Sequence, residues 1–221
     1  MAIKLSQKLK VKSQKLKNKR ILITAGPTWV PIDEVRVISN IATAKTGIII
    51  AEEAKKQGAQ VRLFLGPAGL DYSNKSIRIR RFKYFSELKD IISKELSKKL
   101  YDIIIHSAAV SDFSTVKFKG KLESSRDYNL KLKRLPKIIK IMRRLAPDAK
   151  LVMFKLESGL SDALLISKAE LAQHKINADY VVANRTNPYR AFIISKKGNS
   201  IVASSKVELA KKLLKSLSYN L

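Results

Sequence analysis

The residues best suited to bind a ligand lie in a long polar loop near the N-terminus. An apolar, β-branched run from Ile21 to Thr24 precedes this loop, which carries Asp33, Glu34, Arg36 and Asn40. A guanidinium and a carboxamide four residues apart can form a collar around a ligand. Loops much longer than the usual few residues of an α/β connection are functional or disordered, so we interpret this one as part of a binding site.

A second polar turn follows a later apolar strand. The run Tyr101 to Ser107 contains three consecutive isoleucines, a pattern typical of a buried parallel strand. It ends in the small residues Ser107, Ala108 and Ala109, and Asp112 follows shortly after. Ligands collect at the carboxyl ends of strands in open α/β sheets, so this turn is well suited to a nucleotide.

Alternating strands and helices are predicted to hold both loops. We expect strands at Ile21–Thr24, Val61–Leu65, Ile77–Phe82, Tyr101–Ser107, Tyr128–Leu135, Leu151–Phe154 and Ala178–Ala183, with a hairpin of Phe192–Ser195 and Ile201–Ser204. We expect helices from about Ala44 to Gly58, over Ser86–Leu100 and Lys137–Leu145, from about Ser161 to His174, and over Val207–Leu217. Residues 114–127 hold few large apolar side chains and are expected to form a mobile flap. The predicted fold is α/β: a Rossmann-like, doubly wound, mostly parallel sheet with an added C-terminal β-hairpin.

Composition limits the chemistry. The chain has 221 residues, 45% of them hydrophobic, which is enough for the core of one large domain. It has no cysteine and only two histidines, which excludes disulfides, thiolate nucleophiles and cysteine- or histidine-rich metal sites. No 18-residue apolar run or secretory signal is found, so we expect a cytoplasmic protein with no membrane partner.

The net charge of +27 leaves two interpretations open. Residues 1–20 hold seven lysines and one arginine with no acid, so we predict a solvated basic tail over 1–19 and one domain over 20–221. The other lysines are spread over nearly every element, whereas a nucleic-acid reader would pair a focused basic face with exposed aromatics. A non-catalytic nucleic-acid-associated protein therefore stays an alternative, although the favoured function does not require nucleic acid.

An ordered set of motifs, AGPT, PIDEVRVISN, SAAVSDF, GKLESS, LKLKRLPKII, FKLES and DYVVAN, resembles the phosphopantothenate-cysteine ligase family over roughly residues 20–217. The spacing of R-x-x-x-N and A-A-x-x-D carries the resemblance, since the single motifs are weak signals. The family's flavin-dependent decarboxylase domain does not precede this segment, so the resemblance implies a stand-alone ligase that uses no FMN. A Rossmann oxidoreductase is disfavoured because no G-x-G-x-x-G follows the first strand.

The resemblance implies a two-step reaction in coenzyme A biosynthesis. The carboxylate of 4'-phosphopantothenate would attack CTP to give an acyl-cytidylate and pyrophosphate, and the amine of cysteine would then displace CMP. Mg²⁺ is the implied cofactor, and ATP stays possible in place of CTP. Neither step needs a protein nucleophile, because phosphoryl transfer depends mainly on positioning and charge neutralisation.

Residue roles also follow from the resemblance. Asn40 and Lys121 are the implied catalytic residues, and the implied substrate-binding residues are Arg36, Asn40, Ala108 and Ala109. The implied nucleotide-binding residues are Ser107, Ala108, Asp112, Lys121, Pro136, Lys137, Ile138, Ile139, Phe154, Lys168 and Lys175, with Asp112 also near the metal. The resemblance further implies a homodimer in which Arg36 of one subunit completes the site that contains Lys121 of the other.

Each assignment has an ordinary structural alternative. Asn40 can cap a turn, Asp112 can cap a helix, and Phe154 can belong to the core. Arg36 and Lys121 can be solvated surface residues, and the paired alanines can serve packing alone. Lys168 and Lys175 are seven residues apart, which is longer than expected for the family's pair.

The chain also departs from the family's pattern. The family reads N-x-S-S-G-x-x-G after the asparagine, whereas this chain keeps a hydroxyl at Thr43 and a glycine at Gly47 but has Ala44 in place of the inner glycine. Alanine is strained at positive φ, so a left-handed turn at Ala44 is in doubt. Gly26-Pro27 stands where two glycines are common in the family.

Overall fold

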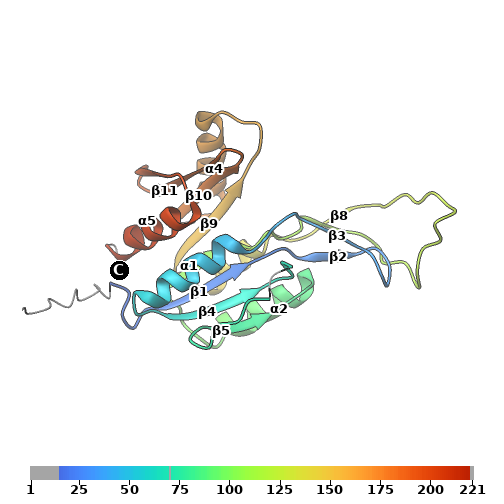
Figure 1. Cartoon of the computed structure of the whole chain (residues 1–221), viewed down its shortest axis with the longest axis horizontal. Helices are drawn as coiled ribbons and strands as arrows, with labels where there is room; N and C mark the ends of the chain where they lie inside the picture. The colour runs from blue at the N-terminus through green and yellow to red at the C-terminus, as the bar shows by residue number, and fades with distance from the viewer. Residues whose placement is uncertain (1–14, 70, 220–221) are drawn as a thin grey trace, which may run out of the picture.

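A computed structural model describes residues 15–69 and 71–219 (Figure 1). The strands of its main sheet are β1 (Arg20–Ala25), β4 (Gln60–Leu65), β5 (Arg78–Arg81), β6 (Ile103–His106), β9 (Lys150–Leu156), β10 (Tyr180–Thr186), β11 (Tyr189–Ser195) and β12 (Ser200–Ala203). The helices are α1 (Lys45–Lys56), α2 (Phe85–Leu96), α3 (Ile138–Leu145), α4 (Asp162–Ile176) and α5 (Lys206–Ser218). Within this part of the chain, no helix is long and apolar enough to cross a membrane.

The main sheet confirms the predicted doubly wound architecture. Its strand order is β12-β11-β10-β9-β6-β1-β4-β5, with parallel pairing from β10 to β5 and antiparallel pairing of β10, β11 and β12. The chain leaves β1 toward β4 on one side and later returns to β6 on the other side. The strand order therefore reverses between β1 and β6, and this reversal is where ligands bind in such sheets.

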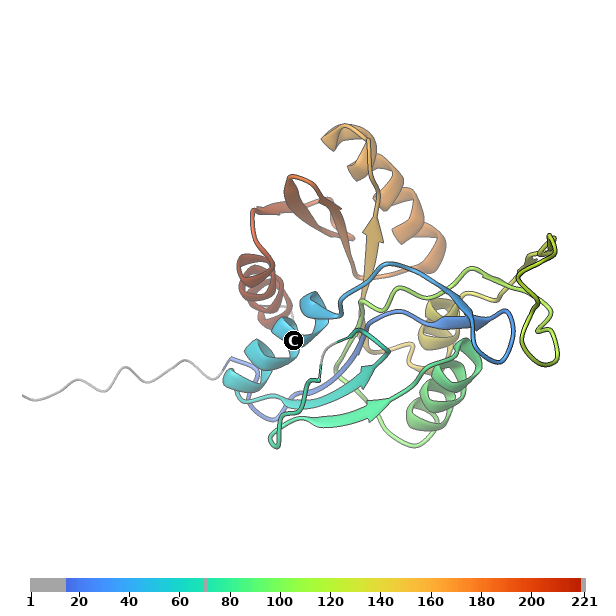
Figure 2. The same ribbon diagram turned by 45° about the vertical axis from the view of Figure 1, so that its right-hand side comes forward.

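Two apolar layers cover the sheet. Side chains alternate along each strand, so Ile21 and Ile23 face α1 and α5 whereas Leu22 faces α2, α3 and α4. Helices α1 and α5 pack side by side on the first face, as both views show (Figures 1 and 2). Central strands such as β1 and β6 are apolar on both sides because helices cover both faces, as in other parallel sheets.

The folded domain begins earlier than predicted. Leu16 is fully buried in the layer with α1 and α5, and its backbone N–H donates to the carbonyl of Gln57 at 3.2 Å. The boundary predicted at residue 20 is therefore wrong by a few residues, because one apolar side chain within the basic run is part of the core. The predicted tail up to residue 14 lies outside the described residues.

An arm projects from the sheet (Figures 1 and 2). We define the arm as residues 29–39, which form the antiparallel pair of β2 (Trp29–Pro31) and β3 (Val37–Ser39), together with residues 113–134. The second segment opens and closes with the short pair of β7 (Phe113–Ser114) and β8 (Lys133–Arg134). Main-chain and side-chain hydrogen bonds, described below, tie the two segments together.

Several predicted elements differ from the structure. The strand predicted over Tyr128–Leu135 is reduced to Lys133–Arg134, because this segment lies on the exposed arm and alternation there meets no core. The predicted helix Ser86–Leu100 ends at Leu96, and Leu100 is 76% exposed. The predicted helix Lys137–Leu145 begins at Ile138, with Lys137 as its N-cap, so Pro136 lies just before the helix and not in its first turn.

Gly47 is the tightest point where α1 meets the sheet. A methyl group added at Gly47 would lie 2.5 Å from Cβ of Ala25 and 2.7 Å from Oγ of Ser107. Both distances are far below van der Waals contact, and neither the strand nor the turn can move independently of the sheet. Gly47 therefore allows the start of α1 to approach the ends of β1 and β6.

We predict that Gly47→Ala lowers the free energy of unfolding. Overpacking of this kind costs about 1–3 kcal/mol, and better helix propensity offsets up to about 1 kcal/mol of that cost. A net loss of about 1 kcal/mol in the free energy of unfolding is expected from urea denaturation. The neighbouring Thr46→Ala, on the same turn of α1, is the control, and an equal effect of both substitutions would contradict the close-approach argument.

Candidate functional site

The turns that follow β1 and β6 form the floor of the candidate site. Ala109 donates its N–H to the carbonyl of Gly26 at 2.9 Å and accepts from the N–H of Thr28 at 3.3 Å. The hydroxyl of Ser107 donates to the carbonyl of Thr24 at 2.7 Å. These bonds continue the parallel pairing beyond the strands, so the two turns lie together at the carboxyl edge, where the strand order reverses.

Asn40 is attached to this floor. Its Nδ2 donates to the carbonyl of Ala109 at 3.0 Å, so the structure brings together Asn40 and the paired residues Ala108 and Ala109. The bond uses one of the two Nδ2 hydrogens and leaves the amide with further donor and acceptor capacity. A site close to the α1 N-terminus is thus built around three of the predicted substrate-binding residues. We call the strip from Asn40 through residues 107–112 to the start of α3 the ligand strip.

Ala44 adopts the left-handed turn that its side chain disfavours. Its φ is 58°, and it is the N-cap of α1 without a side-chain capping bond. The methyl group is buried in the layer between α1 and the sheet, so packing offsets part of the backbone cost of about 1 kcal/mol or more. The altered loop therefore keeps a left-handed turn at the position where the family has glycine.

Two hydroxyl residues that the sequence prediction missed connect the turns. Thr28 is fully buried, and its Oγ1 accepts from the backbone N–H of Ser111 at 2.9 Å while donating to Oγ of Ser111 at 3.1 Å. A threonine directly after Gly26-Pro27 was part of the first motif but received no role. The signal in the sequence that could have indicated this role was the position of Thr28, directly after the tight turn at Gly26-Pro27.

Asp112 and the start of α3 form the other end of the ligand strip. Lys137 Nζ pairs with Asp112 Oδ1 at 2.5 Å, and Asp112 accepts at its carbonyl from the N–H of Leu135 at 2.8 Å. Ile138 and Ile139 are buried, so only their backbone groups could face a ligand. Helix α3 has no side-chain capping bond at its N-terminus, which leaves backbone N–H groups suited to a phosphate.

A complete protein metal site is not found in the described part of the chain. No group of three or more histidine, cysteine or acidic side chains there could hold a metal ion. Mg²⁺ commonly takes one or two carboxylates and completes its ligands with substrate phosphates and water. The half-exposed carboxylate of Asp112 could supply one such ligand, so the residues present are compatible with a metal that arrives with a nucleotide.

Arg36 and Lys121 lie together on the arm, away from the ligand strip. Arg36 Nη1 donates to the carbonyl of Leu122, next to Lys121, at 3.1 Å. This contact within one chain argues against the expectation that Arg36 and Lys121 reach one site from opposite subunits. The two residues belong to a single projecting unit.

The remaining predicted residues are dispersed. Phe154 lies within β9, not at its end, and packs against the layer that contains α1 and α5. Lys168 is exposed in the middle of α4. Lys175 is in the last turn of α4, which runs back from the carboxyl edge, so the structure separates Lys175 from the ligand strip by most of the helix length.

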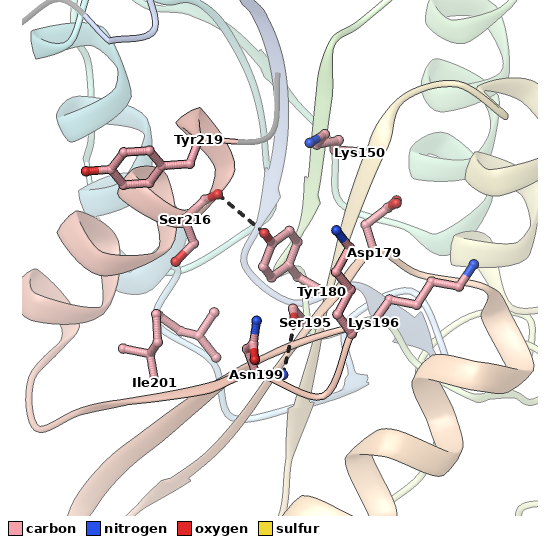
Figure 3. A pocket seen from close by; sticks show the side chains of 11 residues that line it. Lys150, Asp179, Tyr180, Ser195, Lys196, Asn199, Ile201, Ser216 and Tyr219 are labelled. Atoms are coloured by element: carbon pink, nitrogen blue, oxygen red, sulfur yellow. Dashed lines mark hydrogen bonds between the residues drawn. The ribbon is translucent and has the colours of Figure 1, made fainter.

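A further pocket of about 750 Å³ lies at the opposite edge of the sheet (Figure 3). Lys150 and Tyr180, the first residues of β9 and β10, line it together with Lys196 and Tyr219. Tyr180 points toward α5, where its hydroxyl donates to the carbonyl of Ser216 at 3.3 Å. None of the predicted site residues lines this pocket.

Comparisons with known proteins agree with this fold. Residues 16–220 match the model of the DNA/pantothenate metabolism flavoprotein C-terminal domain. The bifunctional coenzyme A biosynthesis protein CoaBC of Methanocaldococcus jannaschii is 34% identical over 209 residues, which cover 90% of this chain and 50% of that protein. The crystal structure of the DNA/pantothenate metabolism flavoprotein from Streptococcus pneumoniae has a TM-score of 0.83 at 25% identity, covering 92% of this chain and 100% of that one.

A crystal structure of the C-terminal domain of CoaBC has a TM-score of 0.79 at 28% identity, covering 94% of this chain and 97% of that one. The chain spans about half the length of the curated relatives it matches. The similarity thus concerns one domain of those relatives.

His106 ends β6 beside this site, and its titration generates a prediction. Its Nδ1 lies 2.8 Å from Oγ1 of Thr24, and burial lowers the pKa of His106 from 6.5 to about 4. The unfolded chain therefore binds more protons than the folded protein between these two pH values. The free energy of unfolding should fall as pH drops from about 6.5 to 4, by up to about 3 kcal/mol from this residue.

His106→Asn should flatten this pH dependence, because asparagine can keep a polar atom near Thr24 without titrating. Urea denaturation at several pH values measures the effect. His174→Asn, which replaces the chain's other and exposed histidine, is the control. If His106→Asn and the unchanged protein lose equal stability between pH 6.5 and 4, the assignment is wrong.

Proposed function

The chain belongs to the family of the DNA/pantothenate metabolism flavoprotein C-terminal domain, and from this premise we propose that it ligates 4'-phosphopantothenate to cysteine. The match over residues 16–220 carries the proposal. The bond from Asn40 to Ala109 supports it, since this contact joins two of the ligase motifs at one ligand-binding edge. The reaction would serve coenzyme A biosynthesis, and its soluble substrates suit a cytoplasmic enzyme.

In the proposed first step, a carboxylate oxygen of 4'-phosphopantothenate attacks the α-phosphorus of CTP. The bond to the β-phosphate breaks, which gives an acyl-cytidylate and releases pyrophosphate. Backbone N–H groups at the starts of α1 and α3 are suited to the phosphates, because neither helix has a side-chain cap. Lys137 and Lys121 would add positive charge, and Mg²⁺ bound with the triphosphate would neutralise further charge there.

In the proposed second step, the amine of cysteine attacks the acyl carbon and CMP departs, leaving an amide after the amine loses a proton. Asn40 could donate to the acyl oxygen and accept from the amine, since its amide is fixed by Ala109. Ala108 and Ala109 are small enough to let substrate approach the backbone. Neither step is an oxidation or a reduction, so we assign no role to FMN.

The proposal is tested by incubating the purified protein with 4'-phosphopantothenate, cysteine, Mg²⁺ and either CTP or ATP. Mass spectrometry should detect 4'-phosphopantothenoylcysteine and the nucleoside monophosphate in equal amounts, with faster formation from CTP. Omitting one component at a time provides the controls. No product with any nucleotide would reject the ligase assignment.

Asn40→Asp should separate the two steps. A carboxylate in place of the amide would repel the acyl phosphate and cannot donate to the acyl oxygen, so the attack by cysteine should be slowed most. Pyrophosphate release should therefore exceed amide formation in this variant, whereas the unchanged protein forms both equally. Equal residual rates of the two steps would contradict the assigned role.

The proposed enzyme is a homodimer whose arm serves the partner's site. The arm exposes large apolar side chains that a monomer would leave in water: Val35, Val37, Ile38, Phe113, Val116, Tyr128 and Leu132. Val35 is 67% and Val116 65% exposed. Such a concentration on a projecting element favours burial against a second copy. In an isologous pair, each arm would then bring Arg36 and Lys121 to the other subunit.

Mixing inactive variants tests this arrangement. Asn40→Asp alters the ligand strip, and Lys121→Gln alters the arm. After subunit exchange, about half of the dimers are mixed, and each would contain one intact and one doubly altered site. Roughly a quarter of the amide-forming activity should return.

Arg36→Ala mixed with Lys121→Gln is the matched control, because both residues lie on one arm and no intact site can form. Exchange is confirmed independently with differently tagged subunits. Recovery of activity in the control mixture would mean that Arg36 and Lys121 reach one site from opposite subunits. Recovery in neither mixture would mean that each arm serves its own chain.

A further inference from the structure

We propose that Asp33 is a positioning residue that holds the segment bearing Lys121 on the β2–β3 hairpin. This inference rests on the proposed ligase function, in which Lys121 contacts the triphosphate. Neither the motif assignments nor the family comparison gives Asp33 a role. The proposal starts from its unusual placement as a buried carboxylate on a largely exposed arm.

Asp33 is only 2% exposed, and both of its oxygens are occupied. Oδ1 accepts from the backbone N–H groups of Val35 at 2.8 Å and Arg36 at 2.6 Å. Oδ2 accepts from Arg36 Nη1 at 2.8 Å and from the N–H of Leu122 at 3.0 Å. One carboxylate thus closes its own turn and binds a segment 89 residues further along the chain.

Hydrogen bonds hold the backbone on both sides of Lys121. Gly120 accepts from the N–H of Glu34 at 3.2 Å, and Leu122 binds both Asp33 and Arg36. The backbone before and after Lys121 is therefore fixed to the hairpin, while the Lys121 side chain stays exposed. This arrangement can aim a lysine without burying it, which is what a residue that closes on a phosphate requires.

The charge state of Asp33 makes this link permanent over the physiological range. Burial raises its pKa, but the backbone N–H groups of Leu122, Val35 and Arg36 and the Arg36 guanidinium outweigh burial and lower the pKa to about 2. The link is thus present above the ordinary carboxyl pKa and is lost only as pH falls toward about 2. Asp33 is a static support and not a pH switch.

Asp33→Asn tests the link with little change in shape. A carboxylate accepts on both oxygens, whereas an amide presents hydrogens on one side. Those hydrogens must face either the N–H groups of Val35 and Arg36 or the donors from Arg36 and Leu122. One of the two sets loses its acceptor, and the buried donors left behind weaken the attachment.

Hydrogen–deuterium exchange of the ligand-free protein reads this attachment without any activity assay. Asp33→Asn should speed exchange in the peptide covering residues 118–122 by about tenfold or more, with the main sheet unchanged. Asp127→Asn removes the same charge from the same arm without altering the Asp33 bonds, and should leave exchange as it was. Unchanged exchange at 118–122, or a general increase across the main sheet, would overturn the positioning role.

A double-mutant cycle then asks whether Asp33 acts through Lys121. We expect Asp33→Asn to lower kcat/KM for the nucleotide by on the order of tenfold to a hundredfold. When Asp33→Asn is combined with Lys121→Gln, it should add almost nothing to the loss caused by Lys121→Gln alone. The reason is that both substitutions remove the same contact, the one between Lys121 and the triphosphate. Losses that multiply would overturn the inference.

Failure of the proposed ligase function and failure of the inference about Asp33 give different results. If the unchanged protein makes no amide, the proposed function fails, while the exchange experiment still decides whether Asp33 holds the arm. If the protein is active but the losses multiply, the ligase stands and Asp33 has a different role. Asp33→Glu, which keeps the charge but lengthens the side chain, should restore exchange protection at 118–122 only partly.

Discussion

The structure depends on the close contact between the turn after β1 and the turn after β6. Ala109 exchanges backbone hydrogen bonds with Gly26 and Thr28, and Gly47 lets α1 approach the same point. This contact exists because the strand order reverses between β1 and β6, which leaves two turns side by side without a crossover helix above them. The contact between the two turns positions Asn40, residues 107–112 and the start of α3.

The arm is held together in a different way. Its mostly polar residues bury too little apolar surface to order a loop, so the arm is held by main-chain pairing and by one buried carboxylate. The arm also carries exposed apolar side chains of the kind that the main sheet buries. A structure of this kind combines local order with a surface suited to a partner, which is consistent with the dimer proposed above.

The fold was largely predictable because its strands are continuous apolar runs such as Ile103–Ile105, separated by amphipathic helices. The prediction failed on the arm. Alternation over Tyr128–Leu135 resembles a strand, but in the folded protein this segment has no core to face. Asp33 ties the short pair Trp29–Pro31 and Val37–Ser39 to Leu122 in the arm's second segment, and a contact between residues 89 positions apart is not visible in a local pattern.

The candidate site, like the fold, was predictable from the sequence only in part. Motifs predicted Asn40, Ala109, Asp112 and Lys137 as site residues, and the structure pairs Asn40 with Ala109 and Lys137 with Asp112. The roles of Thr28 and Asp33 depend on partners 83 and 89 residues away, so no spacing rule reveals them. Lys175 shows the reverse error, since a motif match cannot tell which end of α4 faces the ligand edge.

The most direct test of the central claim, that the chemistry takes place where β1 and β6 diverge, is a crystal structure with a non-hydrolysable CTP analogue and Mg²⁺. The triphosphate should lie against residues 107–112 and the start of α3, within hydrogen-bonding distance of their backbone N–H groups. Nucleotide bound instead in the pocket between Lys150, Lys196 and Tyr219 at the opposite edge would contradict the claim.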